Sequence, residues 1–393
     1  MTTSEAAAGA PVRGALALLA GAALAGFDAG AVGFVLPALR AATGADAAAA
    51  SVVVWVYVLG TLVAIAAGGW ATSHWAPARL LRVSLVLALA GALGSALGQG
   101  LTQLALARLL QGLGQGPLLP LAATLVAARW PPGRQGRLNG ALSLAYGVSF
   151  LGATQLAPWL LAHGGWQAGF GASAAVAALA LAGSVHLPPG RVARPPPGAA
   201  PRRWWRGEML ALGAIALGTG LGQAVLVWLP TVAQARLAVS PQHSGLLMLP
   251  LVVGGLSSTA AITLWLDRVG PRLPIAAGAA LTLAGVALVS LAPATLPCYA
   301  AGTAALGLGV TALCGGPLRV VATQSRPGPV QGRAQAAVAL LTNVGLLAGS
   351  VMLGQVAALA AGDREGVEWA LGAAAVGMLP CFAAFAGLRR RPG

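Results

Sequence analysis

One acidic and one basic side chain stand inside long apolar stretches of this sequence. Asp28 lies near the middle of an apolar run over 14–38, and it is the only acid well inside any such run. Arg108 lies about six residues inside a second run, over 102–128. A charge in hydrocarbon costs several kcal/mol unless it is paired or hydrated. Both residues are therefore candidates for chemistry that uses a charge, and the chemistry open to a buried carboxyl is binding and release of a proton.

The two residues lie at comparable depths along their runs, so the sequence predicts a direct Asp28–Arg108 pair. Asp28 would then hold either a proton or its basic partner. Two alternatives remain open at this point. The pair is a fixed structural ion pair, or Arg108 extends its guanidinium to the nearer interface without a buried partner.

The composition indicates that the elements carrying these residues are membrane helices. The chain is 58% hydrophobic and 8% charged with a mean hydropathy of +0.81, whereas soluble domains carry about 25% charged residues. Its 56 glycines fit a bundle of closely packed helices. We expect twelve spans, at 14–38, 48–71, 79–100, 102–128, 136–161, 166–187, 208–231, 244–266, 272–292, 296–320, 332–360 and 367–388.

Basic residues are distributed between these spans rather than on one face, which argues against a nucleic-acid-binding protein. All 23 are arginines, and 19 of them fall in alternate gaps. By the positive-inside rule, both termini and the arginine-rich segment 188–207 are cytoplasmic. The expected localisation is the plasma membrane or a bacterial inner membrane.

Short matches between the two halves indicate an internal repeat. VLPAL at 35–39 matches WLPTV at 228–232, and GQGPL at 114–118 matches CGGPL at 314–318. QGR at 135–137 recurs at 331–333. The predicted organisation is a six-helix bundle over 1–187, a proline-rich basic linker over 188–207, and a second six-helix bundle over 208–393.

These features together resemble the major facilitator superfamily, and within it the drug:proton antiporter branches. Arg108, Gln111, Gly112 and Gly114 match the R-x-x-Q-G-x-G motif of proton-coupled members. Asp28 resembles the acid of the first helix in drug exporters. The family's turn motif after the second helix is degenerate here, but its second-half copy is present as Asp267, Arg268, Gly270 and Arg272.

The resemblance implies an all-α membrane protein with twelve helices in two pseudo-symmetric bundles. It implies export of small organic compounds, lipophilic or cationic, by proton antiport with alternating access. Asp28 and Arg108 would couple the proton, and the turn at 267–272 would latch the gate; the alternative is that this turn is merely solvated. The fifth helix departs from the antiporter pattern, because Gly152 and Pro158 remain without the expected glycine pairs.

Polar and aromatic residues inside the spans are candidates for substrate binding. In bundles many such residues only join helices through hydrogen bonds. The candidates are Tyr57, Gln111, Gln115, Tyr146, Gln155, Gln223, Trp228 and Asn343.

Other classes of protein fit the sequence less well. The histidines and cysteines lack metal-ligand spacing, and the glycine-rich GLGQG segment follows no strand, so neither an enzyme nor a nucleotide site is expected. We expect no cofactor beyond the proton gradient, and a monomer by analogy with the family. Two functional alternatives stay open: a facilitator or proton symporter for a small metabolite, and a non-transporting membrane sensor or scaffold.

Overall fold

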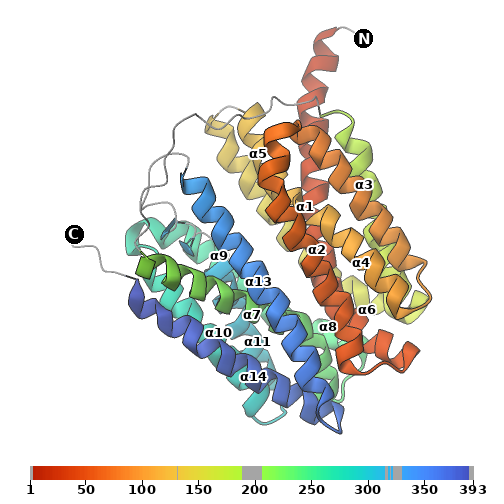
Figure 1. Ribbon diagram of the computed structural model, residues 1–393, viewed down its shortest axis with the longest axis vertical. Helices are drawn as coiled ribbons and strands as arrows, with labels where there is room; N and C mark the ends of the chain where they lie inside the picture. Colours follow the sequence, from red (N-terminus) through yellow and green to blue (C-terminus); the bar gives the residue numbers. More distant parts are fainter. Residues whose placement is uncertain are drawn as a thin grey trace. The chain divides into compact units, whose positions relative to one another are not determined.

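A computed structural model describes residues 3–130, 132–187, 206–314, 317–318, 320–321 and 330–388 (Figure 1). Within these ranges the chain forms helices and connecting turns, with no strand. The predicted linker lies outside the described residues as far as residue 205. By internal contacts the chain divides into two compact units, Met1–Gly44 with Val52–Arg194 and Ala45–Ser51 with Pro195–Gly393.

The first unit holds six helices over the described residues. The beginning of the second of them, as far as Ser51, is grouped with the second unit. They are α1 (Thr3–Thr43), α2 (Ala47–His74), α3 (Pro77–Ala96), α4 (Leu101–Gln115), α5 (Leu118–Arg129) and α6 (Pro132–Ser184). Helix α1 packs along α6, and α3 packs along both α4 and α6. Leucine and alanine side chains of α1, α3, α5 and α6 form its main apolar core.

Local sequence explains where α1 ends and α2 begins. The amide of Gly44 donates to the carbonyl of Arg40, and Gly44 has a φ of 69°, a left-handed conformation that favours glycine. The Asp46 carboxylate then accepts a hydrogen bond of 2.7 Å from the amide of Ala49 and caps the start of α2.

The predicted fifth and sixth spans form the single long element α6. Its candidate membrane-crossing part, Arg137–Ser184, has 48 residues, about 72 Å of helix, whereas a bilayer core is about 30 Å thick. The helix breaks at Gly164 and Gly165, and Gly165 has a φ of 65°. This break divides the element into two crossings, close to the predicted division between 161 and 166.

The second unit holds α7 (Arg206–Leu237), α8 (Pro241–Leu246), α9 (Leu249–Val269), α10 (Arg272–Leu291), α11 (Leu296–Cys314), α13 (Val330–Ala358), α14 (Asp363–Ala383) and the 3-10 turn η1 (Ala384–Gly387). Helix α7 packs on α13 and α14, and α11 packs on α9 and α10. The described residues contain eleven helices long and apolar enough to cross a membrane, and α6 supplies two crossings. The twelve-span, all-α prediction is therefore confirmed.

Two predicted spans are not continuous helices. The fourth span is divided between α4 and α5 at Gly116 and Pro117, and the eighth is divided between α8 and α9 at Leu247 and Met248. Proline has no amide hydrogen to donate and is tolerated only in the first turn of a helix. Pro117 directly precedes α5, and Pro250 is in the first turn of α9, so each proline marks the start of a new helix.

Candidate functional site

Asp28 lies in α1 at the centre of a buried polar cluster in the first unit. Its carboxylate accepts three hydrogen bonds from two other helices: Oδ2 accepts from the side-chain amides of Gln111 and Gln115 in α4, and Oδ1 accepts from the hydroxyl of Ser173 in α6. The side chain is only 4% exposed. Three donors offset part of the cost of burying a carboxylate.

Arg108 is the largest fully buried side chain of the described residues. Its Nε donates to the backbone carbonyl of Val53 in α2 at 3.2 Å, and its Nη1 donates to Gln111 Oε1 at 2.8 Å. The guanidinium carbon lies 4.2 Å from the ring centroid of Tyr57 and 5.4 Å from that of Phe170, so two aromatic rings also face the cation.

The predicted direct pair of Asp28 and Arg108 is replaced by an amide bridge. Gln111 Oε1 accepts a hydrogen bond from the Arg108 guanidinium, and Gln111 Nε2 donates one to the Asp28 carboxylate. No ion pair joins the two charged groups, both of which are fully described. Gln111 is one turn from Arg108 on the same helix, so its amide occupies the position between the charges. The Tyr57 hydroxyl, in turn, donates to Gln115 Oε1 at 2.8 Å.

Two glycines of the α4 motif set the position of these polar side chains. A Cβ added to Gly112 would lie 2.0 Å from the backbone oxygen of Tyr57 in α2, and one added to Gly114 would lie 2.2 Å from the backbone nitrogen of Ala88 in α3. Helix α4 is thus pressed against α2 on one side and α3 on the other. The face that carries Gln111 and Gln115 turns toward α1 as a result.

The second unit repeats these backbone contacts about 195 positions later. Gly307 of α11 approaches the backbone oxygen of Leu251 in α9, as Gly112 approaches that of Tyr57, with the same 2.0 Å for an added Cβ. Gly309 likewise approaches Thr282 in α10. These contacts support the internal repeat that the sequence predicts.

The polar cluster itself is not repeated. By the register of the glycine contacts, the second-unit counterparts of its residues are almost all apolar. Asp28, Tyr57, Arg108, Gln111 and Gln115 correspond to Gly222, Leu251, Thr303, Leu306 and Val310.

Of the remaining substrate candidates, Tyr146 lies near Tyr57 of the cluster, and the others lie apart from it or have local partners. Tyr146 is half-buried in α6, where its backbone oxygen abuts Gly26 of α1. The Gln155 amide donates to the neighbouring Thr154 hydroxyl at 3.1 Å. In the second unit, Gln223 Nε2 lies 2.8 Å from the sulfur of Cys314, and Asn343 donates to Ala339 of its own helix at 2.9 Å.

Trp228 of α7 is buried, and its indole Nε1 has no hydrogen-bond partner among the described atoms. Such a donor is uncommon in a protein interior. It suits an acceptor supplied from elsewhere, so Trp228 stays a candidate for substrate contact.

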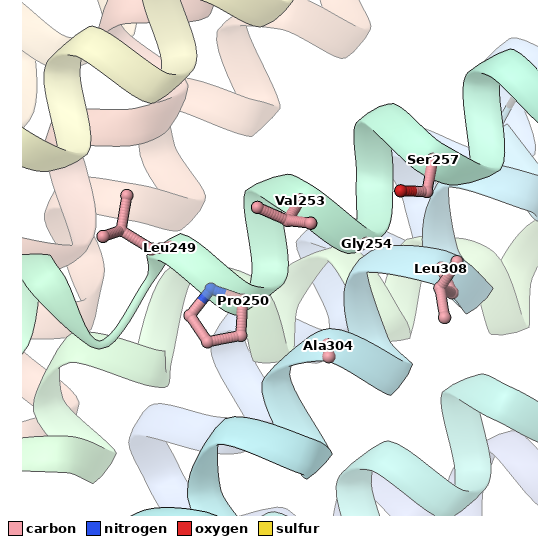
Figure 2. A pocket seen from close by; sticks show the side chains of 7 residues that line it. All are labelled: Leu249, Pro250, Val253, Gly254, Ser257, Ala304 and Leu308. Carbon is pink, nitrogen blue, oxygen red and sulfur yellow. The ribbon is translucent and has the colours of Figure 1, made fainter.

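An apolar groove lies between α9 and α11 of the second unit (Figure 2). It has a volume of about 480 Å³, and the hydroxyl of Ser257 is the one polar side-chain group among its lining residues. The others are Leu249, Pro250, Val253, Gly254, Ala304 and Leu308. Nothing in the sequence pointed specifically to this groove, because apolar residues are common throughout the chain.

The predicted gate turn joins α9 to α10. Gly270 has a φ of 71°, as a tight turn requires, and Arg268 is exposed. Arg272 donates to the carbonyl of Leu388, directly after η1, and its guanidinium carbon lies 5.8 Å from the Phe385 ring centroid. The side chain of Asp267 lies outside the described residues.

The first unit has a similar clamp on the corresponding helices. Arg82 near the start of α3 donates to the carbonyls of Ser184 and Leu187 at the end of α6, at 3.2 and 2.5 Å. The last carbonyls of a helix have no partner within the helix, and a cation there is favourable. In each unit an arginine near the start of the third crossing therefore binds the end of the sixth.

Sequence reasoning missed Ser173 and Phe170, which both come from α6. A serine or phenylalanine in an apolar helix carries little signal by itself. Only the approach of α6 to α1 and α4 reveals their contacts with Asp28 and Arg108.

Comparison with known proteins places this chain in a family. Residues 18–350 match the family model of the Major Facilitator Superfamily. The chain belongs to this superfamily, in keeping with its many helices that are long and apolar enough to cross a membrane.

Relatives with assigned names are distant. A triacylglyceride transporter of Mycolicibacterium smegmatis is 26% identical over 383 residues, which cover 76% of this chain and 66% of that protein. A multidrug resistance protein B homolog of Mycobacterium tuberculosis is 28% identical over 120 residues, 30% of this chain and 22% of that protein. The chain thus spans less than two thirds of the length of these relatives.

Solved structures show the same fold. The crystal structure of a D-xylose–proton symporter matches with a TM-score of 0.76 at 18% identity, covering 94% of this chain and 96% of that one. A bacterial homolog of the human lysosomal transporter Spinster matches with a TM-score of 0.73 at 15% identity, covering 96% and 98%.

Proposed function

We propose that this transporter exports small lipophilic or cationic organic compounds in exchange for protons. The observation that carries the proposal is the buried Asp28 carboxylate, held by three donors and joined through Gln111 to the buried Arg108. A fixed structural pair would need no bridging amide between its charges. The cluster also explains why a charged acid is retained in an apolar helix.

The charge of the cluster favours exchange of a proton for a cation. With Asp28 ionised, the carboxylate and the Arg108 guanidinium sum to zero. With Asp28 protonated, the cluster carries one positive charge, which repels a cationic compound in a site of low dielectric constant. The proton and the cation therefore exclude each other, and this exclusion is the requirement for antiport.

The other parts of the proposal follow the same family pattern. The turn at 267–272 acts as the gate latch, supported by the bond from Arg272 to the end of the last helix. The protein works as a monomer in the bacterial inner membrane or plasma membrane, with both termini in the cytoplasm, and it uses the proton gradient without a cofactor.

The first experiment follows a lipophilic cationic dye in proteoliposomes with an acidic lumen. We expect the wild-type protein to accumulate the dye, by about tenfold per pH unit for one proton exchanged. Asp28→Asn keeps the shape of the side chain and removes the titration, so it should only equilibrate the dye. Glu365→Gln makes the same chemical change on an exposed acid of α14 and should behave as wild type.

Other results would redirect the proposal. Equal equilibration by wild type and Asp28→Asn would mean a facilitator, with a structural role for Asp28. Accumulation driven in the opposite direction would mean a proton symporter.

A neutral lipid is the second candidate substrate. The groove between α9 and α11 is lined almost wholly by apolar side chains, and the relative that aligns with most of the chain is a triacylglyceride transporter. The same vesicles, offered a fluorescent acylglycerol in place of the dye, separate the two candidates. Transport of the acylglycerol but not of the dye would favour the lipid.

A further inference from the structure

The hydrogen bonds around Asp28 have a defined direction, because several partners can act in only one sense. Arg108 only donates, so it must face the oxygen of Gln111, and the nitrogen of that amide must face Asp28. Gln115 turns its oxygen to the Tyr57 hydroxyl and its nitrogen to Asp28. Both amides therefore act as donors to the same carboxylate oxygen, Oδ2.

The other carboxylate oxygen, Oδ1, faces the hydroxyl of Ser173, and a hydroxyl can both donate and accept. A proton on Oδ2 would point at two N–H donors and find an acceptor only if Gln115 turned over and the Tyr57 hydroxyl reversed. Gln111 cannot turn over, because its NH₂ group would then face the guanidinium. A proton on Oδ1 needs only a rotation of the Ser173 O–H bond.

We propose that Asp28 takes up its proton on Oδ1, and that Ser173 is the residue that reverses from donor to acceptor. An O–H bond forms at Oδ1 as a hydronium ion loses one O–H bond and becomes water, and no covalent bond of the protein breaks. The assignment rests on the proposed proton coupling, since it names the oxygen that binds the proton. The charged and titratable neighbours are Arg108 of α4, Tyr57 of α2 and, near Tyr57, Tyr146 of α6.

The assignment confines the structural effect of proton uptake to one helix contact. The hydrogen bonds among Arg108, Gln111, Gln115 and Tyr57 stay the same in both states, so α2 and α4 keep their connection. The bond that changes direction joins α1 to the half of α6 that follows its break at Gly164 and Gly165. Proton uptake therefore changes a hydrogen bond of α6. Arg108 keeps its hydrogen bonds and loses only the negative charge of the Asp28 carboxylate nearby.

Infrared difference spectroscopy between acidic and neutral pH tests the assignment on the full-length protein in liposomes. The C=O stretching band of protonated Asp28 is assigned by its absence in Asp28→Asn. Hydrogen bonds to a carbonyl oxygen lower its stretching frequency. With the proton on Oδ1, the carbonyl oxygen is Oδ2, which accepts from Gln115.

We expect Gln115→Met to shift the band upward by more than Ser173→Ala does. Ser173→Thr keeps a hydroxyl and should restore the wild-type band. Tyr57→Phe is a milder variant that should leave the band in place, because Gln115 still donates to Oδ2.

The reverse order of the two shifts, or a band displaced in Tyr57→Phe, would place the proton on Oδ2 and overturn the assignment. Absence of any Asp28 band over the pH range in which the protein stays folded would overturn it together with proton coupling. A band that behaves as expected in a protein that does not accumulate substrate would leave the assignment standing and refute the proposed antiport.

Discussion

Arg108 combines features that usually conflict in a membrane protein. It is 1% exposed and carries a full charge, yet it donates to one backbone carbonyl and one side-chain amide and stacks on two aromatic rings. A guanidinium can make these contacts at once because it is planar and has several donors in a fixed geometry. Lysine has one compact ammonium group and cannot reproduce them.

Truncation of Arg108 should therefore be strongly destabilising. Arg108→Ala leaves Asp28 without an opposite charge and leaves the buried Gln111 side-chain oxygen without its donor, which we expect to cost about 3–5 kcal/mol. Arg108→Lys should fold better but lose coupled transport. Thermal unfolding in detergent and dye accumulation in vesicles measure the two effects.

Arg364→Ala is the matched control, because Arg364 is 60% exposed and pairs with Glu368 one turn along the same helix. Its expected cost is below about 0.5 kcal/mol. Equal stability losses in Arg108→Ala and Arg364→Ala would contradict the structural role given to the buried arginine.

For individual residues, the sequence predicted most members of the Asp28 cluster, but it did not predict which of them contact one another. Asp28, Arg108, Gln111, Gln115 and Tyr57 were all candidates, because charged and polar residues stand out in an apolar helix. Their connectivity could not be predicted, since it depends on which side-chain amide reaches between the charges.

At the scale of helices, α4 owes its place to glycines rather than to polar contacts. Gly112 and Gly114 face two different helices at distances that no side chain could fill. The R-x-x-Q-G-x-G pattern thus combines the polar side chains of the cluster with the small residues that bring them to Asp28. Close packing through small residues is the usual means of helix association in a bilayer.

Gly112→Ala should separate α4 from α2. The added methyl group would lie 2.0 Å from the Tyr57 backbone oxygen, and the required shift should cost about 1–3 kcal/mol. We expect a lower unfolding temperature in detergent and loss of dye accumulation.

Gly147→Ala in α6 is the control, since an added Cβ there meets nothing within 4 Å. Alanine is the better helix former by about 1 kcal/mol, so this variant should be as stable as wild type or slightly more so. A normal unfolding temperature and normal transport in Gly112→Ala would show that α4 can move away from α2 without consequence.

The hydropathy of the sequence predicted the membrane crossings but not the breaks within them. Hydropathy placed every crossing, with ends that differ from the observed spans by up to about six residues, because apolar length is a strong signal. It did not show the breaks inside the fourth and eighth spans, since a break of two residues hardly changes the mean hydropathy. Pro117 and Pro250 were visible in the sequence, but proline is also found within membrane helices, so their presence alone was ambiguous.

At the scale of the whole molecule, the two units share their backbone contacts but differ in chemistry. The glycine contacts of α4 recur in α11, whereas the acid, the arginine and the amides of the first unit have small or apolar counterparts. The repeat therefore preserves the packing of the helices but not the acid on which the proposed proton coupling depends.

One proton site should mean one proton per transport cycle. With the membrane potential clamped at zero, the logarithm of the dye accumulation ratio should rise with the pH difference at a slope of one. A slope of two would require a second titrating group that Asp28 does not supply. Asp28→Asn provides the control, because its slope should be zero.

Cys314, which contacts Gln223, is one of three cysteines whose location has a practical consequence for following transport in real time. All three cysteines of the chain, Cys298, Cys314 and Cys381, are in the second unit; none of them is in a disulfide, and each is half-buried. A maleimide-linked fluorophore or spin label that reacts with a native thiol would therefore be attached to the second unit. The unit that contains Asp28 holds no thiol, so a reporter would observe the second unit while the Asp28 cluster stays chemically unmodified.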